Sequence, residues 1–172
     1  MRKWWYLVIL ALVLCGCRNR SELETVSDVI QTPEKAEPME VSLYVPEDAA
    51  LSVMSTQENG SIYFCDNYTL LLHTVPSGDL NKTVMEVSGF MPDQLPILKT
   101  KKANCVGYDF VWSAVGEQGD QVCRCTILDD ENYHYVLTAM ADAETAGQLA
   151  EGEWETIFRS FSLAEPDQVN TD

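Results

Sequence analysis

The pattern of hydrophobic and polar positions between residues 41 and 163 predicts a single domain made mostly of strands. Short runs rich in aromatic and aliphatic residues alternate with turn residues such as Asp, Asn and Gly, which is typical of β-strands joined by tight connections. The predicted strands are Met39–Val45, Ser61–Cys65, Tyr68–Val75, Ile97–Ala103, Cys105–Val115, Asp120–Leu128 and Asn132–Ala141, with Ser162 and Leu163 as a short closing strand.

Two segments have the 3.6-residue spacing of amphipathic helices. The first begins after Ser77, the expected N-cap, and ends at Gly89. The second begins after Asp142 and runs to about Phe161, with Gly152 weakening its first half. Its apolar positions are Ala150, Trp154, Ile157, Phe158 and Phe161.

The order of these elements is strands, a helix, an antiparallel meander and a C-terminal helix, which predicts an α+β fold with helices packed on an antiparallel sheet. A turn at residues 117–118 would join the two longest strands. That turn places Trp112 opposite Cys123 and Phe110 opposite Cys125.

The first seventeen residues, MRKWWYLVILALVLCGC, have the pattern of a secretory signal. Arg2 and Lys3 precede a mostly apolar run, Trp4–Gly16, which is shorter than the roughly 20 residues that a membrane-spanning helix needs. An ordinary secretory signal or an uncleaved anchor would share this pattern.

The stretch Leu14-Cys15-Gly16-Cys17 resembles the lipobox of bacterial lipoproteins. The resemblance implies a signal peptide over residues 1–16, diacylglyceryl transfer to the sulfur of Cys17 and cleavage after Gly16. We therefore expect lipid anchoring at the cell membrane, on its extracytoplasmic side. Residues 17–40 are polar and predict a disordered tether, and residues 164–172 a disordered tail.

The charge of the chain argues against a nucleic-acid partner. The formal net charge is −16, and losing residues 1–16 removes two cations, which moves it to −18. Binding to phosphates needs clustered Lys and Arg side chains. The acidic turn Asp129-Asp130-Glu131-Asn132 leaves weak divalent-cation binding open, but it lacks the alternating ligands of a calcium loop.

The cysteines allow several interpretations. Cys65, Cys105, Cys123 and Cys125 can be core thiols or can form disulfides outside the cytoplasm, although Cys123 and Cys125 cannot bond to each other along one extended strand. Zinc would need a second paired motif, which the sequence lacks. The alternative to a binding protein is a metal binder, or an enzyme that uses His134 with Cys123 or Cys125.

The sequence contains no fingerprint of a hydrolase, zinc protease, P-loop or dinucleotide site, so we expect no catalytic residue, no metal ligand and no cofactor. Tyrosines serve both at core edges and on binding surfaces. A possible binding surface therefore consists of Tyr63, Tyr68, Tyr133 and Tyr135.

From Ser61 to Leu163 the chain resembles the PsbP-like fold of thylakoid oxygen-evolving proteins and small bacterial lipoproteins. The order of elements and the closing pattern Trp154-x3-Phe158-x2-Phe161-x-Leu163 carry the resemblance. It implies binding or assembly rather than one chemistry. The sequence therefore predicts a non-enzymatic binding or assembly module for a protein or envelope partner, with an envelope small-ligand binder as a further alternative.

Overall fold

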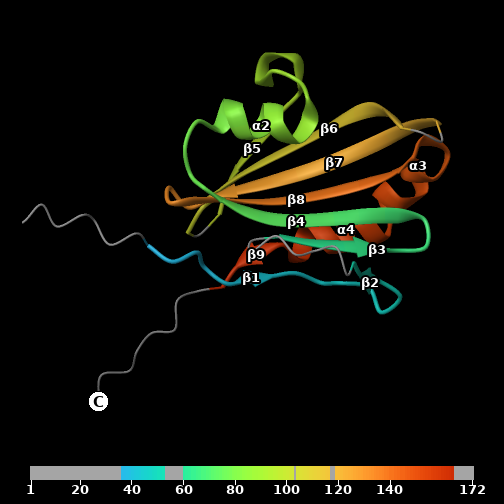
Figure 1. Ribbon diagram of the computed structural model, residues 1–172, viewed down its shortest axis with the longest axis horizontal. Coiled ribbons are helices and arrows are strands. Elements are labelled where there is room, and N and C mark those ends of the chain that lie inside the picture. The colour runs from blue at the N-terminus through green and yellow to red at the C-terminus, as the bar shows by residue number, and fades with distance from the viewer. Residues whose placement is uncertain (1–35, 53–59, 103, 117–118, 165–172) are drawn as a thin grey trace, which may run out of the picture. The chain divides into compact units, whose positions relative to one another are not determined.

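A computed structural model of the chain describes residues 36–52, 60–102, 104–116 and 119–164 (Figure 1). Residues 1–35 lie outside this range. The predicted signal peptide, Cys17 and most of the predicted tether therefore lie outside the described residues, as does the tail 165–172. No helix within the described ranges is long and apolar enough to cross a membrane.

Seven strands form one antiparallel sheet in the order β2-β3-β4-β8-β7-β6-β5. A separate pair of short strands, β1 and β9, is also antiparallel. The bounds are β1 Val41–Ser42, β2 Ala50–Leu51, β3 Gly60–Phe64, β4 Tyr68–Pro76, β5 Leu98–Lys101, β6 Val106–Gly116, β7 Gly119–Asp129, β8 Tyr133–Asp142 and β9 Ser162–Leu163.

The long hairpin of β6 and β7 has the register that the turn position predicts. Trp112 pairs with Cys123 and Phe110 with Cys125, so this prediction is confirmed. The next strand, β8, lies between β7 and β4 and is buried over nearly its whole length. A strand buried on both faces needs apolar side chains on both, which explains the weak alternation of its sequence.

Helices cover both faces of the sheet (Figure 1). Helix α2, Leu80–Ser88, lies on one face, where Val84 joins a core with Phe110, Ile127 and Val136. Helices α3, Ala143–Glu151, and α4, Glu153–Ser160, contribute to a second core on the opposite face. Its largest fully buried side chains are Trp154, Tyr135, Phe161, Leu70, Leu128, Leu137 and Ile157.

The start of the described chain packs against the sheet. The Met39 amide donates to the hydroxyl of Tyr135 at 2.7 Å, and the hydroxyl of Tyr133 donates to the carbonyl of Ala36 at 2.7 Å. The Ala164 amide donates to the carbonyl of Glu40 at 2.8 Å, beside the β1–β9 pair. Residues 36–40 thus belong to the domain and not to the tether, and the predicted boundary at residue 40 is too late.

Two features of the predicted helices are wrong. The N-cap of α2 is Asp79 instead of Ser77, because the Asp79 carboxylate accepts the Asn81 amide at 3.0 Å. The predicted C-terminal helix is broken at Gly152, which has φ −122° and ψ −99° and separates α3 from α4. In α3, before the break, Ala150 is exposed and Ala146 is the buried residue.

The predicted strands differ from the structure mainly at their ends. Met39–Val45 is a strand only over Val41–Ser42, and β5 is shorter than the predicted Ile97–Ala103. Strand β2 and the short 3₁₀ turn η1, Pro92–Gln94, were not predicted as regular elements. Both are too short to show a periodic pattern.

Candidate functional site

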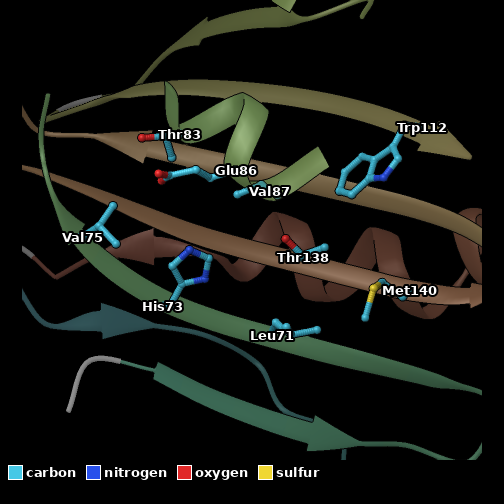
Figure 2. Close-up of a pocket in the computed structure, with 9 residues that line it drawn as sticks. All are labelled: Leu71, His73, Val75, Thr83, Glu86, Val87, Trp112, Thr138 and Met140. Carbon is cyan, nitrogen blue, oxygen red and sulfur yellow. The ribbon is translucent and has the colours of Figure 1, made fainter. Parts of the chain in front are cut away.

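A groove of about 220 Å³ opens between helix α2 and the sheet (Figure 2). Its walls come from α2, β4, β6 and β8, so it brings together segments that are distant in the sequence. Nine residues line it: Leu71, His73, Val75, Thr83, Glu86, Val87, Trp112, Thr138 and Met140.

The alternation of strand side chains determines which residues reach the groove. On β4, Leu71, His73 and Val75 point to the α2 face, whereas Tyr68 and Leu70 on the same strand join the core on the other face. On α2, Thr83, Glu86 and Val87 are three and four residues apart and so share one helix face. The lining is therefore mainly apolar, with a few polar groups.

Thr138 is a buried polar residue of the lining, with 5 % of its surface exposed. Its hydroxyl oxygen Oγ1 has no nitrogen or oxygen partner among the described residues. The hydroxyl lies against the thiol of Cys125, a weak hydrogen-bonding group. A buried hydroxyl without a strong partner costs free energy.

His73 and Glu86 are the titratable groups in the lining. Burial lowers the pKa of His73, and the negative charge of Glu86 offsets this only in part. At neutral pH His73 is therefore an uncharged imidazole that both donates and accepts hydrogen bonds. Glu86 is exposed and lies 3.5 Å from the Lys82 ammonium.

His134 lies beneath the N-terminal half of α2 and is fully buried. Its Nδ1 is 2.8 Å from Oγ1 of Thr83, and its Nε2 is 3.4 Å from Oγ of Ser77. Nε2 also lies 3.8 Å from a carboxylate oxygen of Asp129. Burial lowers the pKa of His134, opposed by the charges of Asp129 and Asp130, so the ring is neutral near pH 7.

These contacts are structural and do not form a catalytic triad. In a triad the acid orients one ring nitrogen while the nucleophile contacts the other. Here Ser77 and Asp129 both approach Nε2. These contacts connect α2 and the segment before it to the N-terminal end of β8.

The alternative in which His134 acts with a nucleophilic cysteine does not fit the structure. Cys125 pairs across the sheet with Thr138, four residues and about 13 Å along β8 from His134. Burial raises the pKa of the Cys125 thiol to about 12, with a smaller opposing effect of the Thr138 hydrogen bond. Burial also raises the pKa of Cys123. Neither thiol is a thiolate at neutral pH, as a nucleophile requires.

The four predicted thiols are free in the structure. Cys123 and Cys125 pack in the core beneath α2 with Phe110 and Trp112, and Cys105 is buried on the other face. Cys65 is only partly buried. Burial is the main cause that raises the pKa of Cys65 and Cys105.

The tyrosine binding surface is wrong for three of its four members. Tyr68, Tyr133 and Tyr135 are buried in the core that α3 and α4 cover, and only Tyr63 stays partly exposed. The hydroxyl of Tyr135 donates to Asp130 at 2.8 Å and accepts the Met39 amide. The sequence did not indicate that helices cover these tyrosines.

The aspartates of the acidic turn before β8 accept hydrogen bonds from nearby backbone amides. Asp129 accepts the Glu131 amide at 2.9 Å, and Asp130 accepts the amides of Asn132 and Tyr133 at 2.9 and 2.6 Å. Nowhere in the described ranges do three or more His, Cys, Asp or Glu side chains gather in a way that would hold a metal ion.

No family model and no curated protein matches the chain. Among solved structures, cyanobacterial PsbP (CyanoP) from Synechocystis sp. PCC 6803 is similar, with 10 % identity and a TM-score of 0.53 over 72 % of this chain and 86 % of that one. A crystal structure from Bacteroides thetaiotaomicron VPI-5482 has 8 % identity and a TM-score of 0.51, over 73 % of this chain. The match spans only 45 % of that longer protein.

LpqN of Mycobacterium tuberculosis, described as involved in cell envelope biogenesis, has 14 % identity over 76 % of this chain and 87 % of that one. Its TM-score of 0.49 is too low to bear on the fold. The similarity to CyanoP confirms the predicted PsbP-like fold, an antiparallel sheet with a few helices. At 10 % identity it establishes the fold alone.

Proposed function

We propose that this chain is a membrane-anchored, extracytoplasmic lipoprotein that binds a protein or envelope partner and catalyses no reaction itself. The observation that carries the proposal is the groove beside α2, an apolar cleft whose polar groups suit hydrogen bonding and not bond-breaking chemistry. Neither His73 nor Thr138 in this groove has the partners of an activated base or nucleophile among the described residues.

The resemblance of Leu14–Cys17 to a lipobox supports the anchor. Each buried methylene of an acyl chain contributes about 0.8 kcal/mol to membrane binding, and two chains hold a protein stably where one does not. A diacylglyceryl group on Cys17 meets this requirement. The polar segment that follows would then place the domain outside the membrane surface.

The anchor is tested by intact-mass measurement and fractionation of the full-length protein made in bacteria. We expect a mature chain that begins at Cys17, carries a diacylglyceryl group and sediments with membranes. The Cys17→Ser variant should lose the lipid and remain unprocessed, whereas Cys15→Ser should behave as the wild type. An unacylated wild-type chain in the cytosol would contradict the proposal.

Partner binding at the groove is tested by photo-crosslinking in intact cells. A photoreactive residue at Val87, which lines the groove, should give a discrete adduct with one partner. The same residue at Met85, an exposed α2 position outside the lining, is the matched control and should not. Equal adducts from both positions, or none from Val87, would count against the groove.

A small ligand is a second candidate, because the groove combines apolar side chains with the imidazole of His73. Native mass spectrometry of the protein purified from its host would then show the protein carrying a bound small molecule. His73→Leu, which removes the polar imidazole from the lining, should abolish the bound mass. A bound mass that persists in His73→Leu would count against this candidate.

A further inference from the structure

Strand β6 has an open edge over Phe110–Gly116. Along one side, all of β6 pairs with β7. Along the other, β5 pairs only with Val106–Asp109. In the described part of the chain no other strand or backbone group bonds to this side of Phe110–Gly116. Alternate residues of this stretch therefore point backbone N–H and C=O groups outward, as in any edge strand.

An exposed apolar stripe follows the same edge. Val111 and Val115 lie on one face of β6, and Leu98 of β5, which pairs with Asp109, lies on that face too. They are 48 %, 87 % and 64 % exposed. Since Ser113 between the two valines is also exposed, helices α3 and α4 leave this margin of the sheet uncovered.

The edge lacks the devices that usually prevent strand pairing. Sheet edges are commonly protected by Lys, Pro, bulges or short length. Strand β5 has two lysines, Lys99 and Lys101, within only four residues. The stretch Phe110–Gly116, FVWSAVG, has no charge and no proline, and most of its residues favour strands. An unprotected apolar edge on a soluble domain suggests a surface that another chain covers.

Acidic groups lie at the hairpin end of the sheet, on β7, β8 and α3, which is the side of β6 away from its open edge. Asp120 pairs across the hairpin with Val115, and together with Asp142 and Glu144 it lines a cavity of about 430 Å³. None of the three carboxylates forms an ion pair within the described ranges. At the opposite end of the edge lie Lys99 and Lys101. These lysines pair with Tyr108 and Val106 and therefore lie on the α2 face, opposite to Val111 and Val115.

We propose that an extended segment of a partner protein adds to Phe110–Gly116 as a further strand, with a basic residue at the end beside Val115. Its backbone would pair with the open groups of β6, and its apolar side chains would cover Val111 and Val115. In an antiparallel arrangement the N-terminal end of the segment lies beside Val115, where Asp120 attracts a cation. A second copy of this chain fits less well, because its net charge of −16 would repel an identical molecule.

This surface lies on the opposite face of the sheet from the groove beside α2, since Trp112 faces the groove while Val111 and Ser113 face away. The proposal therefore depends neither on the groove nor on the lipid anchor.

The test uses the full-length chain in detergent and a synthetic eight-residue peptide, Lys-Lys-Val-Thr-Val-Thr-Val-Thr, as the probe. Amide hydrogen exchange of the free chain should show alternating fast and slow amides over 111–116. Addition of the peptide should slow the fast ones. A peptide with two Glu in place of the two Lys is the control and should bind about tenfold more weakly, because Asp120, the neighbour of Val115 on β7, repels it.

Two variants test the edge itself. Val115→Lys should weaken peptide binding about tenfold, since it places a cation against the basic end of the probe. Its high exposure means that it should not alter the unfolding temperature. Leu51→Lys is the matched control, a 59 % exposed position at the opposite edge of the sheet, and should not weaken binding.

Three results would overturn the proposal. Slow exchange of every amide over 111–116 in the free monomer would show that the chain itself covers the edge. Equal binding of the Lys and Glu peptides would exclude a basic occupant. Protection that appears with protein concentration, together with a dimer in sedimentation that Val115→Lys dissociates, would identify a second copy as the occupant.

Discussion

Thr83 and His134 lie 51 positions apart in the sequence, and a hydrogen bond of 2.8 Å joins Oγ1 of Thr83 to Nδ1 of His134. Both side chains are buried. This contact connects α2 to the N-terminal end of β8. Because Thr83 also lines the groove, the contact helps to position the wall that α2 forms.

Removing the Thr83 hydroxyl should destabilise the domain. In Thr83→Val the shape remains while Nδ1 of His134 loses its partner, and a buried polar group left unpaired costs about 1–3 kcal/mol. Urea denaturation should show this loss in the free energy of unfolding. Thr83→Ser keeps the hydroxyl and should lower the free energy of unfolding clearly less than Thr83→Val. Equal decreases in the two variants would mean that the hydrogen bond contributes little to stability.

Acid should destabilise the domain through its histidines. Burial lowers the pKa of both His134 and His73 in the folded chain, so the unfolded chain binds protons more readily. Stability should therefore be complete above the ordinary pKa of about 6.5 and fall as the pH drops below it, until the folded pKa values are reached. Denaturation curves from about pH 7.5 to about pH 5 measure this dependence.

The two histidines can be separated by substitution. His73→Gln and His134→Gln should each make the stability less dependent on pH in this range, whatever their effect at pH 7.5. A pH dependence that neither substitution reduces would assign the acid sensitivity to other groups.

The thiols should differ in reactivity. Cys65 is only partly buried, whereas Cys105, Cys123 and Cys125 are buried, and the pKa of Cys125 is raised to about 12. A brief iodoacetamide treatment near pH 8 should therefore modify Cys65 first in the native protein. Peptide mapping gives the order, and the same treatment in denaturant is the control in which all four should react. Early modification of Cys125 would contradict its burial.

Substitution of Gly89, at the C-terminal end of α2, should destabilise the domain. Its φ is +77°, in the left-handed region, and its amide donates to the carbonyl of Met85 at 2.8 Å. Gly89→Ala should cost about 1–2 kcal/mol. Gly78→Ala is the matched control, because that glycine also has open space around its missing side chain but no left-handed φ, and it should be neutral or slightly stabilising. Equal effects at both positions would rule out the backbone conformation as the cause.

Several features of this protein follow from the sequence alone because they depend on neighbouring residues. The α+β class and the existence of the long strands were correctly predicted from local periodicity. The pairing of Phe110 with Cys125 was also correct, since a tight turn sets the register of its own hairpin. The C-terminal aromatic positions Trp154, Phe158 and Phe161 are buried, as their spacing predicts.

The candidate site, by contrast, depended on the tertiary structure. Strand alternation shows that Tyr135 and Leu137 share a face, but not that α4 covers it. Three tyrosines that the sequence allowed either at core edges or on a binding surface are therefore core residues. Likewise, nothing near His134 in the sequence indicates Thr83 as its partner, and the groove gathers residues from four separate elements. Periodicity in the sequence predicts that a side chain is buried. Which residues cover that side chain depends on the packing of segments that are distant in the sequence.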